Sequence, residues 1–315
     1  MEAFIASIPP GHSRYSRKGL ELPVPYKQYR KEQVKTAYLF ITPALLGLAI
    51  FTFVPMVSAL FLSFTEYNVL TSPKWIGLEN YLRLFSDRDF GHSLTNTLLY
   101  ALGTMPAKIF VSLLLAFLLN RKVKGLALFR GLYYAPEVTS MVAVSIIWLY
   151  MYNPQIGLFN IILGKFGIAN QAWLFNPKLA LPSLMLMGVW KNLGVNMIIY
   201  LAALQGVPRM YIEAADLDGA TGWQIFWKII WPLLSHATFF ILITNLIGTI
   251  QVFDQIYVMT NGGPANATTT VVHQIYLRAF QQFHMGYASA MAFCLSIIIF
   301  ALTLLNFRLR KTIDY

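Results

Sequence analysis

Polar side chains interrupt two of the long apolar runs in this chain, and their types suit the recognition of a hydroxylated molecule. Amides, hydroxyls and a carboxylate can hydrogen-bond the hydroxyl groups of a sugar, and an aromatic side chain can cover the apolar face of the sugar ring. Asn192 and Asn196 are four residues apart, as are Asn245 and Thr249, so each pair shares a face if its run is helical. The candidate pathway residues are Trp190, Lys191, Asn192, Asn196, Asn245, Thr249, Gln251 and Asp254.

These residue types also have a purely structural interpretation. Polar groups inside a bilayer are costly unless they are paired or face water, which makes them functional candidates. Amides and hydroxyls can instead join one helix to another, with a contribution of about 1 kcal/mol each. The same choice applies to Lys108 and Glu137, which follow prolines within apolar runs and could either pair or line a pathway.

A second group of candidates lies in residues 211–234, YIEAADLDGATGWQIFWKIIWPLL, where Glu213, Asp216 and Asp218 fall between two apolar runs. Residues 209–220 predict a short helix with one apolar stripe of Met210, Ala214 and Leu217. Gly219 follows where such a helix can stop. The helix is either a solvated connection or a docking element whose stripe fills a groove on a partner protein.

The composition indicates that these candidates are positioned by membrane-spanning helices. Mean hydropathy is +0.56, and 12% of residues are charged, against about 25% in soluble domains. Six apolar runs are long enough to span the hydrocarbon, which needs about 20 residues. We therefore expect an all-α integral membrane protein with one membrane domain over 37–310 and short tails at 1–36 and 311–315. The expected spans are 37–64, 94–119, 126–152, 180–207, 234–259 and 286–307.

The distribution of lysine and arginine predicts the orientation. Six spans put both tails on one side, together with two of the connections, and that side carries 16 basic residues against 6 on the other. The excess predicts that both termini, and the 209–220 segment, are cytosolic. The basic N-terminal segment lacks the features of a cleavable signal peptide.

Several function classes are disfavoured. The net charge of +11 comes from residues placed between apolar runs, so we do not expect a nucleic-acid partner. The single Cys294 cannot form an internal disulfide. No phosphate-binding G-x-x-x-x-G-K-[ST] motif and no clustered catalytic set occur, so we expect neither ATP hydrolysis nor other covalent chemistry in this chain. Metal-ligand spacing is not found among the histidines, which are His12, His92, His236, His273 and His284.

At this point the sequence resembles a known family. Glu213-Ala214-Ala215, followed by Gly219, Ile229 and Pro232, is similar to the EAA signature of permease subunits of binding-protein-dependent ABC importers. That signature usually has leucine before the proline, where this chain has Trp231. The stretch QVFDQIYVMTNGGPANATTTVVHQIYLRAF (251–280) resembles the carbohydrate-importer branch, on the side of the larger permease of maltose transporters. The resemblance extends from about residue 37 to about residue 310.

The resemblance implies a type I ABC importer permease fold in which 209–220 is a coupling helix that docks on an ATPase subunit. Glu213 would meet a basic residue of the ATPase, Ala214 and Ala215 would allow close contact, and Gly219 would permit the turn. The implied coupling residues are Glu213, Ala214, Ala215, Asp216, Gly219, Ile229 and Pro232. Gly262, Gly263 and Pro264 predict a turn, which the resemblance places on the outer face near the binding protein.

The resemblance also implies the partners and the location. We expect a second permease subunit, two ATP-binding subunits that carry ATP and magnesium, an extracytoplasmic solute-binding protein and surrounding lipid. The chain itself would hold no cofactor and would lie in a bacterial or archaeal cytoplasmic membrane. The expected cargo is a sugar or polyol-type solute, with glycerol phosphate as an alternative. An ion-gradient-driven secondary transporter is the alternative from another class, although such proteins often contain internal repeats and we find none.

Overall fold

The computed structural model describes residues 26–120 and 125–311, which are mostly helical. The chain divides into two compact units, Met1–Ser58 and Ala59–Tyr315. Residues 1–25 and 312–315, which belong to the predicted tails, lie outside the described residues. The basic residues Arg121, Lys122 and Lys124 lie outside them as well.

The first unit contains α1 (Tyr26–Leu48), the π-helical turn η2 (Ala49–Phe53) and the start of α2 (Val54–Ser63). Helix α1 begins ahead of the span expected from residue 37, so part of the predicted tail is helical. Apolar side chains along these helices are exposed, including Phe40 at 79% and Phe51 at 81%. A helix that is apolar on all sides is typical of a buried helix or of a membrane span.

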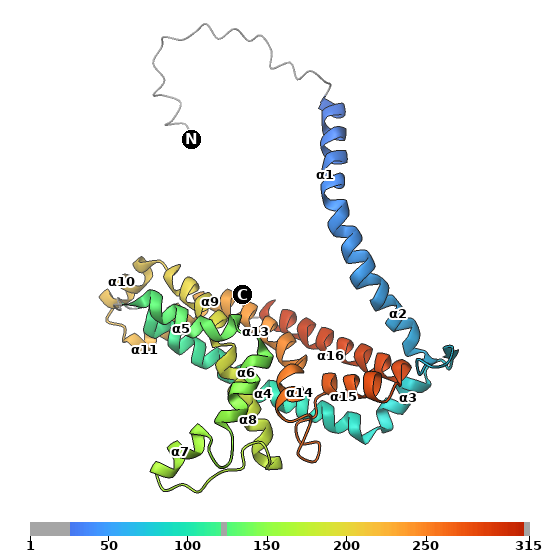
Figure 1. Cartoon of the computed structure of the whole chain (residues 1–315). Helices are drawn as coiled ribbons and strands as arrows, with labels where there is room; N and C mark the ends of the chain where they lie inside the picture. Colours follow the sequence, from blue (N-terminus) through green and yellow to red (C-terminus); the bar gives the residue numbers. More distant parts are fainter. Residues whose placement is uncertain (1–25, 121–124, 312–315) are drawn as a thin grey trace. The chain divides into compact units, whose positions relative to one another are not determined.

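The second unit is a bundle of helices with one minimal sheet (Figure 1). Strands β1 (Thr65–Glu66) and β2 (Lys74–Trp75) pair antiparallel. The helices and π-helical turns that follow are α3 (Glu79–Ser86), α4 (Arg88–Leu119), α5 (Leu126–Val138), α6 (Met141–Met151), α7 (Leu158–Lys165), α8 (Pro177–Lys191), α9 (Leu193–Gln205), α10 (Arg209–Leu217), α11 (Gly222–Ile225), η3 (Phe226–Ile230), α12 (Trp231–Leu233), α13 (Ser235–Ile250), α14 (Asp254–Met259), α15 (Val271–Tyr276), η4 (Leu277–Gln281) and α16 (Met285–Lys311).

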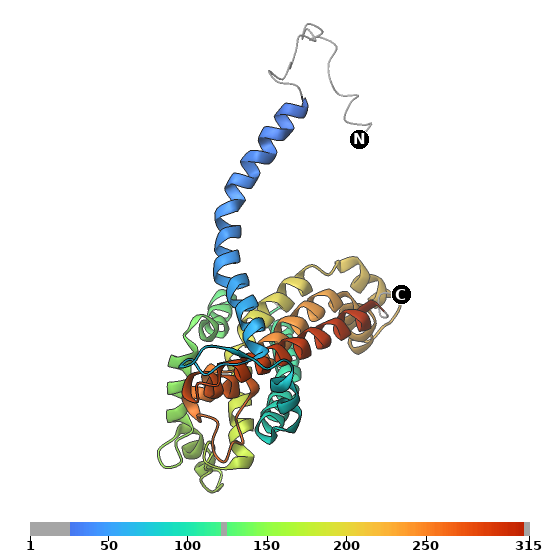
Figure 2. The same ribbon diagram turned by 90° about the vertical axis from the view of Figure 1, so that its right-hand side faces the viewer.

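Helix α4 is the central element of this unit, since α8, α9 and α13 all pack against it. The two views in Figures 1 and 2 show α4 running beside these helices, with α16 alongside α13. Close packing is visible at Gly194 of α9, where an added Cβ would lie 2.4 Å from the Tyr133 carbonyl oxygen of α5. Only glycine therefore permits the observed approach of α5 and α9.

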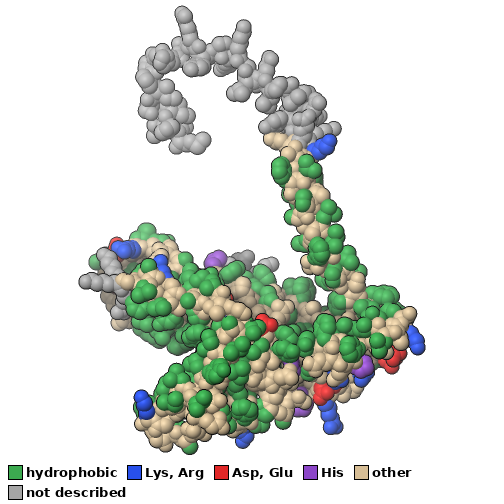
Figure 3. All heavy atoms as spheres, in the orientation of Figure 1, with side chains coloured by type: hydrophobic (Ala, Val, Ile, Leu, Met, Phe, Trp, Pro, Cys, Tyr) green, Lys and Arg blue, Asp and Glu red, His purple; other side chains and the backbone are tan. Residues whose placement is uncertain are grey.

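Length and composition allow up to six membrane spans among the described residues. Three single helices qualify, Gln33–Ser63, Arg88–Leu119 and Met285–Arg308. Three bent helix pairs qualify as well, with bends of 101° between α5 and α6, 46° between α8 and α9, and 64° between Gly222–Leu233 and Ser235–Ile250. On the second unit, hydrophobic side chains cover most of the face in Figure 3, and charged side chains gather mainly near its margins. That distribution suits a protein whose middle contacts lipid.

The end of the fifth predicted span differs from the structure. The apolar run suggests a span over 234–259, but α13 ends at Ile250 and a separate helix, α14, begins at Asp254. Polar residues Gln251 and Asp254 interrupt the run here, and an acidic residue is favoured in the first turn of a helix. The polar candidates at 251–255 consequently lie on a break between helices.

Candidate functional site

Helix α10 forms where the sequence predicts a short helix, and its end is set by Gly219. The Gly219 N–H donates to the Asp216 carbonyl (3.1 Å), and the Ala220 N–H donates to the Ala215 carbonyl (2.9 Å). This pair of hydrogen bonds at the end of a helix requires a residue with a left-handed backbone conformation after the helix. Gly219 has φ +72°, which a residue with a side chain rarely adopts.

The predicted apolar stripe of α10 faces away from its own chain. Met210 is 66% exposed and Leu217 is 90% exposed. Glu213, Ala214 and Asp216 are exposed as well. A helix of this length therefore presents acidic and apolar side chains together on its free surface, as a docking helix does.

The opposite face of α10 anchors it. Ile212, Ala215 and Ala220 pack against a buried cluster that includes Leu204 and Ile225. Ala215, assigned by resemblance to close contact with the ATPase, is thus half-buried within its own chain. The anchoring gives α10 a fixed position at one end of the second unit, beside α11 (Figure 1).

The chain after α10 reverses through a second defined cap. The Gln224 N–H donates to the Thr221 hydroxyl (3.4 Å), and the Thr221 N–H donates to the Gln224 side chain (2.7 Å). This reciprocal arrangement is a capping box, and it starts α11. Of the remaining predicted coupling residues, Ile229 is half-buried in η3 and Pro232 is exposed in α12.

A cavity of about 230 Å³ lies where α4 meets the break between α13 and α14. Five of the eight predicted pathway residues line it: Asn192, Asn245, Thr249, Gln251 and Asp254. Amide, hydroxyl and carboxylate groups thus converge on one wall from helices that are distant in the sequence. A concave site with convergent polar groups is a candidate binding site for a small solute.

Eight further residues line the cavity without being among the predicted site residues, and they include Tyr100, Lys108 and Gln255. Tyr100 and Gln255 are buried, and the Gln255 amide donates to the Tyr100 hydroxyl (2.5 Å). Lys108 also lines the cavity, which supports the second of its two sequence-based interpretations. A tyrosine in an apolar run gives no signal of its own, so Tyr100 could be found only once α4 and α14 were seen together.

The other three predicted pathway residues lie off this wall. Lys191 is buried and donates from Nζ to the Glu137 carbonyl oxygen (2.8 Å). Trp190 is exposed and packs against Trp148, with ring centroids 5.5 Å apart. Asn196 accepts a hydrogen bond from the Asn245 amide (3.1 Å), and so joins α9 to α13. Asn245 therefore joins two helices and also lines the cavity.

The predicted turn at Gly262-Gly263-Pro264 is held by a set of buried threonines. The Thr268 hydroxyl donates to the Gly263 carbonyl (2.7 Å), and the Thr269 hydroxyl donates to the Gly262 carbonyl (3.2 Å). Gly262 has φ +82°, and an added Cβ would lie 2.4 Å from the Thr269 hydroxyl.

Burial lowers the pKa of the neighbouring His273, which favours its neutral form.

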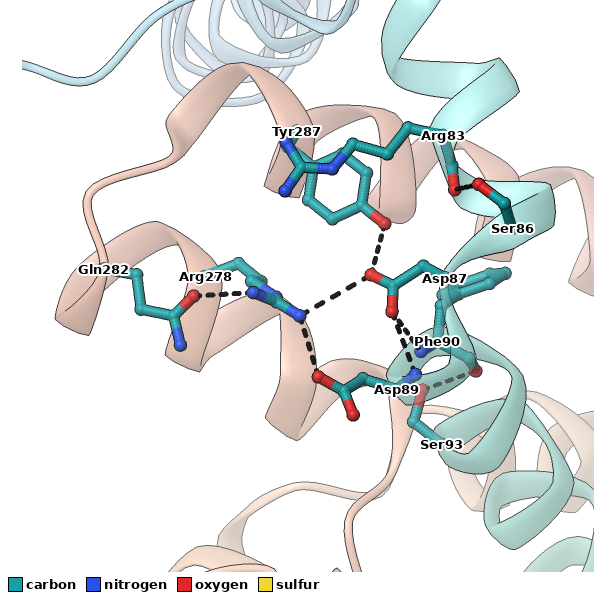
Figure 4. Close-up of polar contacts among 9 residues, drawn as sticks. All are labelled: Arg83, Ser86, Asp87, Asp89, Phe90, Ser93, Arg278, Gln282 and Tyr287. Carbon is teal, nitrogen blue, oxygen red and sulfur yellow. Dashed lines mark hydrogen bonds and ion pairs between the residues drawn. The ribbon is translucent and has the colours of Figure 1, made fainter.

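A charged network joins the start of α4 to η4 and α16 (Figure 4). The Asp87 carboxylate accepts from the Asp89 N–H (2.9 Å), the Phe90 N–H (3.4 Å) and the Tyr287 hydroxyl (2.6 Å). Arg278 lies 3.5 Å from Asp87 and 3.0 Å from Asp89. The N-cap of the central helix is therefore also its link to the last helix.

This network makes stability sensitive to acid. Burial by itself raises the pKa of Asp87, but the Tyr287 hydroxyl, two backbone N–H groups and the Arg278 guanidinium together hold that pKa below its ordinary value of 3.8. A carboxyl group with a lowered pKa in the folded state stabilises the fold above its ordinary pKa. That contribution is lost as the pH falls through the pKa of the folded state.

We expect the thermal midpoint of the purified protein to fall as the pH is lowered from about 5 to about 3. Asp87→Asn keeps a side chain that can cap α4 but removes the charge. This variant should have a lower thermal midpoint than the wild type at neutral pH, and its midpoint should fall less between about pH 5 and about pH 3. Glu79→Gln, at an exposed acid of α3, is the matched control. A wild-type acid slope in Asp87→Asn would contradict the assignment.

Comparisons with known proteins identify transport proteins of the inner membrane, in agreement with the apolar helices described above. A family model described as "Binding-protein-dependent transport system inner membrane component" matches residues 108–315. The probable ABC transporter permease protein YesP of Bacillus subtilis is 38% identical over 287 residues, covering 90% of this chain and 92% of that protein. The sn-glycerol-3-phosphate transport system permease protein UgpA of Agrobacterium fabrum is 33% identical over 285 residues, covering 88% and 96%.

A solved structure shares the fold. One chain of a bacterial ABC transporter involved in the import of the acidic polysaccharide alginate matches with a TM-score of 0.79 at 22% identity. The match covers 92% of this chain and all of that chain. At this level of identity the likeness supports the fold alone.

The chain thus belongs to the family of inner membrane components of binding-protein-dependent transport systems. It is an ABC importer permease, an all-helical multi-pass protein of the inner membrane, and not itself an enzyme. The predicted family and fold class are confirmed. The alternative of an ion-gradient-driven transporter is set aside by the family match, and permease subunits of this family carry no cofactor.

Proposed function

We propose that this permease passes a sugar or polyol-type solute from an extracytoplasmic binding protein to the cytosol. The observation that carries the proposal is the cavity beside α4, where Asn192, Asn245, Thr249 and Asp254 converge. Amides and a carboxylate suit a molecule rich in hydroxyl groups, since an amide can donate to or accept from a hydroxyl and a carboxylate can accept from one. Trp190, Lys191 and Asn196 remain proposed pathway residues outside this wall.

In this proposal α10 couples the permease to an ATP-hydrolysing partner. Its exposed face pairs the acids Glu213 and Asp216 with the apolar Met210 and Leu217. Apolar side chains would fill a groove on the partner while the acids meet basic residues there. Gly219, Ile229 and Pro232 would set the path of the chain into the next span.

The proposed complex contains a second permease, two ATP-binding subunits and a solute-binding protein. ATP and magnesium would lie on the ATP-binding subunits, since this sequence has no phosphate-binding loop. Support for the binding protein comes from a related alginate transporter solved in complex with an alginate-bound periplasmic protein, at 22% identity and a TM-score of 0.75. The turn at Gly262, Gly263 and Pro264 would face that partner.

The proposed orientation places both termini and α10 in the cytosol. Its support is the excess of basic residues on that side of the sequence. In Figure 1, α10 and α11 lie at one end of the second unit and α3 at the other, as opposite membrane faces require.

Transport in this scheme is a change in the balance between two states. The cavity opens outward to receive the solute and inward to release it. A ligand shifts such an equilibrium only by binding one state more tightly than the other. Nucleotide on the partner would favour the outward state, and hydrolysis with release would restore the inward state.

Glycerol phosphate is the second candidate cargo, because the UgpA relatives are named for sn-glycerol-3-phosphate transport. A panel assay separates the candidates. The complex purified through this chain is reconstituted in vesicles with ATP inside and its binding protein outside, and uptake of labelled sugars, polyols and glycerol phosphate is measured. ATP-dependent uptake of a member of the panel is the expected result. A complex that hydrolyses ATP but moves none of them would overturn the proposal.

A further inference from the structure

Lys108 is a buried cation on the wall of the cavity beside α4. It is 5% exposed and lines the cavity together with amide and hydroxyl side chains. Its ammonium donates no hydrogen bond to any described residue, and no carboxylate in the described part of the chain lies within ion-pair distance of it. A buried charge is costly unless it is paired and hydrogen-bonded. This ammonium has no such acceptor within the described chain, and a solute in the cavity could supply one.

The charges around Lys108 do not supply that acceptor. Glu137 and Lys191 both interact electrostatically with it, but neither lines the cavity. Lys191 is already hydrogen-bonded to the Glu137 backbone carbonyl. Two cations and one carboxylate leave this part of the protein with an excess positive charge.

The rest of the wall is neutral apart from Asp254. Asn192, Asn245 and Thr249 contribute amides and a hydroxyl. Asp254 is exposed, so water screens its charge, whereas the charge of the buried Lys108 is screened much less. The cavity therefore combines a weakly screened cation with uncharged groups that can bind hydroxyls.

We infer that the transported solute is a hydroxylated anion and that Lys108 binds its anionic group and selects it over neutral analogues. The inference rests on the proposed function, in which this cavity holds the solute. A lysine ammonium is a compact point charge that accepts either a carboxylate or a phosphate. The anionic group can thus come from an acidic sugar or from a phosphorylated polyol.

The test uses two pairs of probes that differ in the anionic group. Galacturonate is compared with galactose, and glycerol 3-phosphate with glycerol, in ATP-dependent uptake by the reconstituted complex with its binding protein. Binding of each probe to the purified complex without binding protein is measured in parallel, so that selection by the permease is separated from selection by the binding protein. The variants are Lys108→Gln, Lys108→Arg and the control Lys165→Gln, which removes an exposed lysine away from the cavity.

We expect the wild type to prefer the anionic member of one pair, and that pair identifies the source of the charge. Lys108→Gln should reduce this preference about tenfold or more, because a hydrogen bond to a charged group is lost. Lys108→Arg should keep most of it and Lys165→Gln all of it.

Three outcomes would overturn the inference. One is a wild type that takes the neutral member equally well, and another is a Lys108→Gln variant with an unchanged preference. In both cases the importer function would stand and the charge selection would fail. In the third outcome the complex hydrolyses ATP but neither binds nor moves any of the four probes, and the proposed sugar or polyol cargo fails together with the inference.

Discussion

Glu213→Lys is expected to reduce ATP-driven uptake about tenfold or more while the helices of the permease remain folded. Glu213 is exposed on α10, so its replacement disturbs no internal packing. If the acid meets a basic residue on the ATP-binding subunit, the reversal places like charges at the interface. Such a juxtaposition costs several kcal/mol, and each 1.4 kcal/mol corresponds to a factor of about ten in affinity.

The variant should co-purify less ATPase, and the remaining complex should hydrolyse ATP without matching uptake. The matched control is Glu79→Lys, an exposed acid on α3 at the other end of the second unit, which should keep wild-type association. Normal ATPase association together with normal uptake in Glu213→Lys would refute a docking role for α10.

Gly194→Ala is expected to lower the apparent thermal midpoint of the protein by about 5 °C or more. The new Cβ would lie 2.4 Å from the Tyr133 carbonyl oxygen and 2.8 Å from the Tyr134 Cα. Both atoms belong to the backbone of α5, so they cannot move aside as a side-chain end can. Relief requires α5 and α9 to separate, which loosens the packing around the bend at Asn192.

Gly131→Ala provides the comparison on the same helix pair. Gly131 lies within α5, and a Cβ added there meets nothing within 4 Å. Alanine is the better helix former by up to about 1 kcal/mol, so this variant should match or exceed the wild-type midpoint. Equal midpoints for Gly194→Ala and the wild type would show that α5 and α9 do not approach as closely as the structure has them. The midpoints are measured by thermal unfolding of the detergent-purified protein.

The helical class, the number of apolar runs and the position of α10 could be predicted from the sequence, because each depends on a local pattern of residues. A stripe at helical spacing and a glycine at its end predict a short helix wherever it lies. The exposure of Leu217 and Met210 is consistent with that pattern. Residues of one helix face, such as Asn245 and Thr249, could likewise be grouped from spacing alone.

Contacts between distant segments could not be obtained in this way. Tyr100 and Gln255 are hydrogen-bonded to each other in the cavity lining although they are far apart in sequence, and an isolated tyrosine has no signal of pairing. The bend of 101° between α5 and α6 is also hidden, because an apolar composition does not report direction. Trp190 is a further example. The sequence placed it in the pathway because it lies next to Lys191 and Asn192, but its ring packs on Trp148 and does not line the cavity.

The most direct test of the account is uptake of solute by vesicles that contain either this chain alone or the complete complex. We predict that the complex with its binding protein accumulates solute only when hydrolysable ATP is present. This chain alone, and the complex carrying an ATPase-inactive partner, should accumulate none. Uptake by the purified chain without an ATP-hydrolysing partner would contradict the central claim.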